Sequence, residues 1–407
     1  MQMLSLNELG SVNRGKSKHR PRNDPALYGG NYPFVQTGDI KHSAFYVTSH
    51  SQTYNEIGLA QSKLWDAGTL CITIAANIAD TAILTYPACF PDSIIGFIAD
   101  EKKADTKYVK YCLDIYKKIM LNISLGATQD NMSVSKLLSL KFPIPDLKIQ
   151  KKIAATVSTY DDLIEVNKKR IQLLENMAEE LYKEWFVRFR FPNWENTEFE
   201  KGIPTDWMEV NLGDICNIVM GQSPKSEYYN EEGVGLPFHQ GVGTYGDRFP
   251  INKTYCSIPG RTAYKNDILF SVRAPVGRLN IANTKMIIGR GLSAISSSAG
   301  HNDYLYYLLN YSFGKEDTIG NGAIFNSVTK NELLGFKVLY PSKDIVEEFN
   351  DLASHLNSLI TTLYDTNEKL LSQKDSLLSR LISGKLSVED LDIEFPPSMQ
   401  TEDNNLQ

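Results

Sequence analysis

The amino-acid sequence contains an internal repeat that covers most of its 407 residues. Leu6-Asn7-Glu8-Leu9 in the first half corresponds to Leu212-Gly213-Asp214-Ile215 in the second, and Pro33-Phe34-Val35-Gln36 corresponds to Pro237-Phe238-His239-Gln240. The spacing between matched positions shortens along the chain, as expected for two copies of one ancestral unit with loops of different length. Two copies are too few for a stacked solenoid, which needs at least three units. We therefore predict one globular module used twice, in a protein that recognises two similar sites at once.

The composition is that of a globular protein and excludes several other classes. Hydrophobic residues make up 42% and charged residues 22% of the chain, whose length suits two or three domains. No apolar run reaches the roughly 18 residues of a membrane span, and we expect no signal peptide. The five cysteines are odd in number and scattered, which favours buried thiols in a reducing cytoplasm over disulfides. No cysteine or histidine spacing suggests a metal site.

The charges are distributed unevenly, although the net charge is only −6. Residues 385–407 carry six acids and one base, so the rest of the chain is close to neutral. Local patches, more than whole-chain charge, decide phosphate binding. A solvated loop is the simpler interpretation of one basic stretch, but one stretch in each copy favours a polyanionic partner. The two stretches consist of Arg14, Lys16, Lys18, Arg20 and Arg22, and of Arg261, Lys265, Arg273, Arg278, Lys285 and Arg290.

Each copy is followed by a long amphipathic segment, at residues 147–188 and 343–384. Apolar side chains in both recur at alternating spacings of three and four residues, the pattern of a coiled-coil seam. Helices of about 40 residues would be about 60 Å long, whereas ordinary globular helices average about 11 or 12 residues. A globular module separates the segments, so we expect them to pair antiparallel with each other. The helix residues singled out are Asn167, as the polar residue that fixes the register, with Leu174, Leu181, Trp185, Phe186, Leu363, Leu370 and Leu377.

These features predict an α+β fold in which two similar domains are separated by two long antiparallel helices that form an intramolecular coiled coil. The first domain takes residues 1–146 and the second takes residues 209–342. Residues 189–208 link the first helix to the second domain. The acidic residues 385–407 are expected to be a disordered tail.

The sequence lacks the motifs of several common catalytic sites. It has no phosphate-binding G-x-x-x-x-G-K-[ST] loop, no G-x-S-x-G nucleophile elbow and no H-E-x-x-H zinc motif. Pro91-Asp92 followed by Glu101-Lys102-Lys103 matches the loose PD…E-x-K string of nucleases, in which two carboxylates hold Mg²⁺. The same residues also suit an ordinary charged turn. A stand-alone nuclease using Asp92, Glu101 and Lys103 is one alternative function, and a coiled-coil scaffold without a DNA role is another.

The remaining polar residues suit recognition of nucleic acid. Arg and Lys bind phosphates and guanine edges, and Asn and Gln pair with adenine. Gln36 and Gln240 occupy matched positions, so a shared role in recognition and the role of ordinary surface residues are both open alternatives. Arg273 has an alternative role in a salt bridge to Asp267 of its own module. The candidate DNA-contacting residues are Arg14, Lys16, Ser17, Lys18, Arg20, Arg22, Gln36, Gln222, Ser223, His239, Gln240, Arg273, Arg278 and Arg290.

Four segments carry a resemblance to a known family. They are Leu181–Phe189, Ile203–Trp207, Ser271–Gly277 and Gly289–Leu292. In these segments, and over nearly its whole length, the chain resembles the specificity subunits of type I restriction-modification systems. The first module departs from the pattern, because Thr73–Ala79 stands where the second module has Ser271–Gly277. It therefore lacks counterparts of Arg273 and Arg290.

The resemblance implies a non-catalytic subunit that binds double-stranded DNA and no membrane. In that family, two target-recognition domains each recognise one half of a split, asymmetric DNA sequence. The two helices set the distance between the half-sites and dock two methyltransferase subunits, and endonuclease-translocase subunits join for cleavage. The resemblance also implies a cytoplasmic protein without a cofactor of its own, with S-adenosylmethionine, ATP and Mg²⁺ held by the partner subunits.

Overall fold

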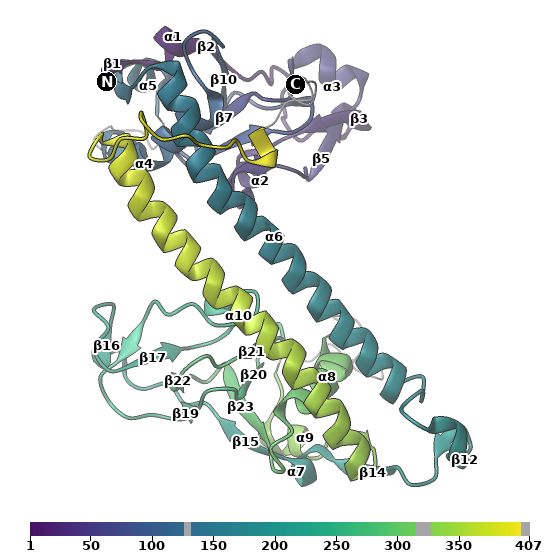
Figure 1. The fold of residues 1–407 in the computed structure, drawn as a ribbon. Coiled ribbons are helices and arrows are strands. Elements are labelled where there is room, and N and C mark those ends of the chain that lie inside the picture. Colours follow the sequence, from purple (N-terminus) through teal and green to yellow (C-terminus); the bar gives the residue numbers. More distant parts are fainter. Residues whose placement is uncertain (126–131, 315–326, 400–407) are drawn as a thin grey trace. The chain divides into compact units, whose positions relative to one another are not determined.

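The computed structural model describes residues 1–125, 132–314 and 327–399. The chain forms two compact units. The first combines residues 1–168 with those from Asp365 onward, and the second comprises residues 169–364. Each unit therefore contains one module together with part of each long helix (Figure 1).

The first module is built on two small sheets. Its larger sheet has the strand order β2-β10-β7-β8-β4 and its smaller sheet the order β5-β3-β9-β6, while β1 pairs with β11. The strands are β1 (Gln2–Leu4), β2 (Gly10–Arg14), β3 (Tyr28–Phe34), β4 (Tyr46–Val47), β5 (Gln52–Tyr54), β6 (Leu64–Trp65), β7 (Leu70–Thr73), β8 (Thr81–Leu84), β9 (Ala88–Cys89), β10 (Ile94–Ala99) and β11 (Phe142–Ile144). The helices are α1 (Leu6–Leu9), α2 (Thr37–His42), α3 (Glu56–Gln61), α4 (Thr106–Leu125) and α5 (Val134–Ser139).

The second module has the same construction. Its sheets have the orders β15-β23-β20-β21 and β16-β18-β17-β22-β19, while β14 pairs with β24. The strands are β14 (Met208–Asn211), β15 (Cys216–Met220), β16 (Tyr229–Asn230), β17 (Leu236–His239), β18 (Tyr255–Cys256), β19 (Thr262–Ala263), β20 (Ile268–Ser271), β21 (Leu279–Ile281), β22 (Met286–Ile288), β23 (Leu292–Ser297) and β24 (Lys337–Tyr340). The helices are α7 (Leu212–Ile215), α8 (Asn302–Phe313) and α9 (Lys330–Leu334).

The strand pairings of the two modules correspond over most of their length. The antiparallel series β2-β10-β7-β8 recurs as β15-β23-β20-β21. The parallel pair β3–β9 recurs as β17–β22, and the terminal pair β1–β11 recurs as β14–β24. The prediction of an α+β fold with two similar domains is confirmed.

Matched capping residues begin the same short helix in both modules. The backbone N–H of Ser5 donates to Glu8 Oε2 at 2.8 Å before α1, and that of Asn211 donates to Asp214 Oδ2 at 3.0 Å before α7. Such reciprocal caps satisfy backbone donors that a helix start leaves unpaired. The conserved spacing of three residues explains why the repeat is visible at these positions in the sequence.

The long helices α6 (Leu147–Phe186) and α10 (Lys343–Ile382) run antiparallel within each unit. In the first unit, Asn167 Nδ2 donates to Asn367 Oδ1 at 2.9 Å, and Lys374 Nζ lies 2.8 Å from Asp161 Oδ1. The residue numbers on α10 therefore rise as those of their contacts on α6 fall, which is the pattern of an antiparallel pair. Asn167, the predicted polar seam residue, is only 3% exposed. A buried amide that must meet another amide disfavours other registers of the helix pair.

The other helix residues singled out from the sequence divide into two groups. Trp185 and Phe186 are buried, with their ring centroids 5.7 Å and 5.0 Å from that of Phe349 on α10. The half-buried group consists of Leu174, Leu181, Leu363, Leu370 and Leu377. The two aromatic residues thus tie the helix pair into the second core, while the leucines remain partly accessible.

Each module completes its core with side chains from both long helices. In the first, Val157 of α6 and Leu381 of α10 lie in one buried cluster with Phe142 of β11. In the second, Tyr182 of α6 and Phe349 of α10 lie in a cluster with residues of α8 and β20. Full burial of such a side chain contributes roughly 1.5–3 kcal/mol. The modules and the helices consequently stabilise one another.

Part of the tail is ordered, so the expectation of disorder is wrong for residues 385–399. Val388 is 3% exposed and belongs to the first core, against which Leu386 also packs. Lys152 of α6 donates to the carbonyl oxygens of Glu389 and Leu391, both at 2.6 Å. The prediction considered only the charges of this stretch. The apolar side chains between the acids pack against the first core and hold the stretch in place. Residues 400–407 lie outside the described part of the chain.

The linker predicted at residues 189–208 is also tied to a module. It contains a two-stranded hairpin of β12 (Phe199–Glu200) and β13 (Ile203–Pro204). Phe191 and Trp207 are buried in the second core, their ring centroids 5.4 Å apart. Within the described ranges, no helix has the length and apolar character needed to cross a bilayer.

A buried arginine joins the second module to both long helices. Arg248 follows a turn of the module and is 3% exposed. Its guanidinium donates to Asn357 Oδ1 of α10 at 2.6 Å and lies 3.3 Å from Glu175 Oε1 of α6. Tyr307 of α8 donates to the same oxygen of Asn357 at 3.0 Å. This hydrogen-bonded cluster fixes the module against the helix pair.

We predict that Arg248→Ala destabilises the second unit by about 2–4 kcal/mol, because it leaves Glu175 and Asn357 desolvated without their partner. The measurement is thermal or urea unfolding followed by tryptophan fluorescence. Lys253→Ala, an exposed cation five residues further along, is the matched control and should leave stability within about 0.5 kcal/mol. Equal unfolding curves for wild type and Arg248→Ala would show that the cluster does not hold the module.

Candidate nucleic-acid interface

In the first module, the basic loop begins in close contact with the backbone that leads into β10. The N–H of Gly15 donates to the carbonyl of Ile94 at 2.9 Å, and that of Lys16 donates to Phe90 at 3.2 Å. A Cβ at Gly15 would lie 2.3 Å from the carbonyl oxygen of Pro91, so only glycine fits. The loop after Gly15 is therefore anchored at its start, and the side chains of Lys16 and Lys18 are exposed.

Three arginines of this loop converge on Asp92, just before β10. Arg22 Nη2 lies 2.5 Å from Asp92 Oδ1, and Arg20 Nη2 lies 3.8 Å from Oδ2. Arg14 Nε donates to the backbone carbonyl of Asp92. Arg20 also donates to the carbonyl of Ser17 at 2.6 Å. Half-exposed ion pairs contribute little stability, about 0–1 kcal/mol, so the main effect of Asp92 is to orient these guanidinium groups.

A hollow of the first module lies beside this arginine cluster. Ser17, Arg22, Gln36 and Gln52 are among the residues that line it. Gln36 precedes α2 and donates through Nε2 to Gln52 Oε1 at 2.8 Å, while Ser17 is nearly buried in the wall. The structure therefore brings together three of the residues predicted from the sequence. Gln52 was not predicted, because the second module has no glutamine at the equivalent position that would have drawn attention to it.

The second module holds its corresponding loop in the same way. The N–H of Gly221 donates to Leu292 at 2.9 Å and that of Gln222 to Ile288 at 3.0 Å. Ser223 Oγ donates to Gln240 Oε1 at 2.7 Å and accepts from the N–H of Arg290 at 3.2 Å. Four of the predicted residues of this module, Gln222, Ser223, Gln240 and Arg290, are thus brought together.

A Gly-Arg-Gly turn presents Arg290 to solvent. The N–H of Gly291 donates to the carbonyl of Gln240 at 3.1 Å. A Cβ at Gly289 or Gly291 would lie 2.7 Å or 2.6 Å from an oxygen of Gln240. The two glycines therefore allow the turn to lie close against Gln240, and the side chain of Arg290 is exposed.

Arg273 and Arg278 lie exposed around the turn that follows β20. Within residues 1–125, 132–314 and 327–399, the side chain of Arg273 has no ion pair. Asp267 instead accepts from the N–H of Tyr264 at 2.7 Å. The alternative of a salt bridge between Arg273 and Asp267 is not observed, and the guanidinium of Arg273 is available to a ligand.

His239 is buried, so the prediction that it contacts DNA directly is wrong. Its side chain is 0% exposed. Nδ1 lies 2.9 Å from Thr244 Oγ1, and Nε2 lies 3.1 Å from Asn252 Oδ1. Burial lowers the pKa of His239, and the hydrogen bond to Asn252 offsets that shift only in part. The imidazole is therefore a structural group beneath the loop that carries Gln240.

The residues of the nuclease alternative do not form a site. Asp92 precedes β10 and Glu101 follows it, so six strand residues, about 20 Å, separate the two ends. Asp92 is engaged by arginines, and Lys103 lies 3.2 Å from Asp100. Across the described ranges, no group of acidic, histidine or cysteine side chains could hold a metal ion. The PD…E-x-K match is consequently a chance one.

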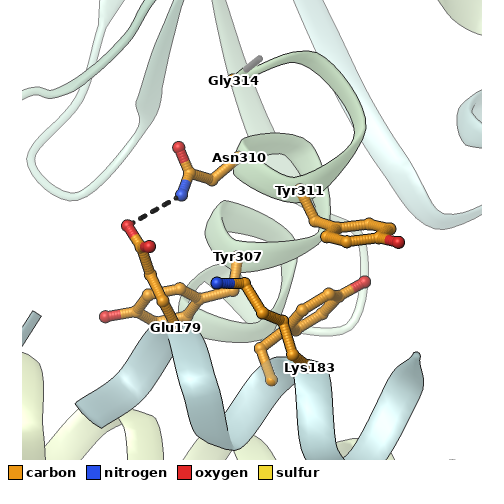
Figure 2. A pocket seen from close by; sticks show the side chains of 7 residues that line it. Glu179, Lys183, Tyr307, Asn310, Tyr311 and Gly314 are labelled. Carbon is orange, nitrogen blue, oxygen red and sulfur yellow. Dashed lines mark hydrogen bonds between the residues drawn. The ribbon is translucent and has the colours of Figure 1, made fainter. Parts of the chain in front are cut away.

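Figure 2 shows a hollow of the second unit that has a different character. Glu179 and Lys183 of α6 face Tyr307, Asn310 and Tyr311 of α8, and Asn310 Nδ2 donates to Glu179 Oε1 at 3.1 Å. None of the candidate DNA-contacting residues lines it, and the Glu179 carboxylate would repel a phosphate. The candidate interface therefore lies on the basic loops and not in this hollow.

Comparison with known proteins gives a consistent result for both halves of the chain. A family model described as the type I restriction modification DNA specificity domain matches twice, over residues 1–176 and 204–370. Each match contains one module and much of the long helix that follows it.

Individual relatives cover most of the chain. A Methanocaldococcus jannaschii chain named as the type I restriction enzyme MjaX specificity subunit is 34% identical over 301 residues, which cover 71% of this chain and 70% of that one. The MjaIX specificity subunit of the same organism is 26% identical over 384 residues, 89% of each chain. The crystal structure of a type I restriction-modification S subunit from M. genitalium has a TM-score of 0.57 at 16% identity and covers 94% of this chain and 96% of that chain, which shows a common fold.

We predict that His239 makes the second module sensitive to acid. Because its pKa is lowered on folding, the unfolded chain takes up the proton more readily, so stability is present above the unfolded pKa of about 6.5 and is lost as pH falls below it. His239→Gln should lower the melting temperature at pH 8 and reduce its further fall between pH 8 and pH 5. His355→Gln, at an exposed position on α10, is the control. An undiminished fall in the His239 variant would assign the acid sensitivity to other groups.

Proposed function

The chain belongs to the type I restriction-modification DNA specificity family, and we propose that each of its two modules recognises one half of a bipartite, asymmetric DNA target. It is a specificity subunit with two target-recognition domains and is not itself an enzyme. The observation that carries the proposal is that the two modules have equivalent backbone hydrogen bonds in their loops but different side chains at the adjoining positions. Ile74 and Val272 donate to equivalent carbonyls, of Ser93 and Gly291, yet the next residue is Ala75 in one module and Arg273 in the other. Similar domains with different contacting groups suit two different half-sites.

The candidate residues divide by the way in which they would meet DNA. Lys16 and Lys18 are exposed cations on a loop and suit phosphates, which carry no sequence information. Arg273 and Arg290 project from tightly held turns and suit guanine edges, while Gln36 and Gln240 suit adenine. A well-defined backbone beneath a polar side chain supports base recognition, because discrimination depends on the orientation of the donors.

We further propose that α6 and α10 set the spacing of the half-sites and dock two methyltransferase subunits. Support comes from apolar side chains of α6 that remain exposed: Leu163, Val166, Leu173 and Met177 are 41%, 44%, 62% and 58% exposed. Leu163 and Val166 in the first unit lie about 60° apart around the helix, and Leu173 and Met177 in the second unit lie about 40° apart, so within each unit the two side chains lie on the same face of α6. An exposed apolar face of this kind is typical of a protein–protein interface.

The proposal assigns the chemistry to other chains. Methyltransferase subunits would bring S-adenosylmethionine, and endonuclease-translocase subunits would bring ATP and Mg²⁺. The assembly would act on chromosomal and incoming DNA in the cytoplasm. This chain would supply only the recognition of the DNA sequence at which those subunits act.

Exchange of one module tests the proposal. Replacing residues 1–146 by the corresponding module of another family member, in complex with the methyltransferase subunits, should change one half of the methylated sequence and leave the other half unchanged. The measurement is genome-wide mapping of methylated bases in cells that express the complex. Replacing residues 209–342 in the same way is the reciprocal control. A simultaneous change of both halves after either exchange would refute independent recognition.

A second prediction separates base recognition from phosphate binding. Arg273→Ala should reduce affinity by on the order of 1–3 kcal/mol for the target and relax a single position of one half-site. The double variant Lys16→Ala, Lys18→Ala should instead weaken binding to all sequences and reduce the salt slope by about one unit per lost phosphate contact. Both are measured on duplexes with single-base substitutions. A uniform loss for Arg273→Ala, together with a lower melting temperature, would assign Arg273 to structure.

A further inference from the structure

Equivalent backbone hydrogen bonds identify a position at which the two modules carry opposite charges. Gly15 donates to Ile94 as Gly221 donates to Leu292, at 2.9 Å in both cases. Ile74 donates to Ser93 at 2.9 Å as Val272 donates to Gly291 at 3.0 Å. The donors and acceptors in these pairs fix the alignment without reference to side chains. The residue before Ser93 is therefore matched with the residue before Gly291.

These matched residues are Asp92 in the first module and Arg290 in the second. Arg290 is exposed on its Gly-Arg-Gly turn, so that a cation stands at this place in the second module. Asp92 is an anion, which by itself would repel the DNA backbone. An acid at the place of a DNA-facing arginine needs an explanation, because the surrounding loop is otherwise basic.

The environment of Asp92 supplies that explanation. Its carboxylate is 30% exposed, and Arg22 lies on one of its oxygens at 2.5 Å while Arg20 lies 3.8 Å from the other. Two cations around one anion leave a net positive group at the position that Arg290 occupies alone in the second module. In the first module, the positive charge at this place is thus supplied by Arg20 and Arg22, which come from a different stretch of the chain.

The contact with Asp92 also determines how Arg22 is presented. A guanidinium carries five N–H donors in a rigid plane, and the carboxylate is bound through Nη2. The directions of the remaining donors are thereby restricted, whereas a free surface arginine would lose more rotamer entropy on binding. Arg22 lines the hollow that also contains Gln36 and Gln52. Arg22 therefore lies beside groups suited to base edges.

We propose that Asp92 is a positioning residue for specificity, which holds Arg22 so that its guanidinium contacts a guanine edge in the half-site of the first module. This inference rests on the proposed function of the chain. Asp92 itself touches no DNA. Its loss removes orientation from Arg22 but leaves the cation in place, which distinguishes it from loss of a contacting residue.

The variant that tests the inference is Asp92→Asn, in the complete complex with methyltransferase subunits. Binding is measured on a duplex that carries the methylated sequence and on duplexes with each single-base substitution, at two salt concentrations. We expect discrimination at one guanine-containing base pair of the first half-site to fall about tenfold. Affinity for a duplex without the target should rise, because the loop gains net positive charge. A merely destabilised module would lose both kinds of binding.

Three further variants serve as controls. Glu101→Gln makes the same charge change at the other end of β10 and should leave discrimination unaltered. Asp92→Glu keeps the charge but moves the carboxylate, so it should reduce discrimination without raising affinity for non-target DNA. Arg22→Ala should relax the same base pair, and combining it with Asp92→Asn should relax that position no further.

The inference is overturned if Asp92→Asn retains full discrimination, or if it weakens target and non-target binding equally. The second result, together with an unchanged melting temperature, would mean that Arg22 meets a phosphate. These outcomes are separate from failure of the proposed function. If the exchange of residues 1–146 alters one half of the methylated sequence while Asp92→Asn has no effect on it, only the role of Asp92 is refuted.

Discussion

The antiparallel pairing of α6 and α10 is the interaction on which the rest of the structure depends. A single amphipathic helix of 40 residues exposes an apolar stripe to water, and each helix covers that stripe with the other and with the modules. Asn167 and Asn367 select the register at a buried hydrogen bond. Because Val157 and Phe349 belong to the module cores, a change of register would disturb both domains. Within each unit, the pairing of the helices and the folding of the module are therefore coupled.

The two modules show how a family can change its target while retaining its fold. The glycine contacts at Gly15 and Gly221 are made by backbone atoms and tolerate no side chain. The neighbouring positions are constrained only through their backbones, so their side chains can differ in size and charge. Ala75 against Arg273 is such a difference. Under the proposed role of Arg273 in DNA recognition, substitution at such positions would change specificity without cost to the core.

The sequence predicted the repeated elements well because they rest on local patterns. Heptad spacing and matched sequence strings are visible in one dimension, and they led to the duplication, the two long helices and the choice of Asn167 as the polar residue of the seam. The partners of single side chains were not visible. His239 lies beside Gln240 in a matched string, yet nothing in that string indicates that Thr244 and Asn252 contact its ring. The significance of Asp92 depends on arginines some 70 residues earlier in the chain.

The order of assembly during synthesis follows from the way in which the first core is completed. The second unit is one continuous stretch, residues 169–364, whereas the first needs Leu381 and Val388 from beyond it. Ribosomes release the chain from its N-terminus, and domains usually fold in that order. Here the domain that is translated first must wait, with part of its apolar surface uncovered, until the other has been made. We expect nascent chains that end before α10 to be the form most dependent on chaperones.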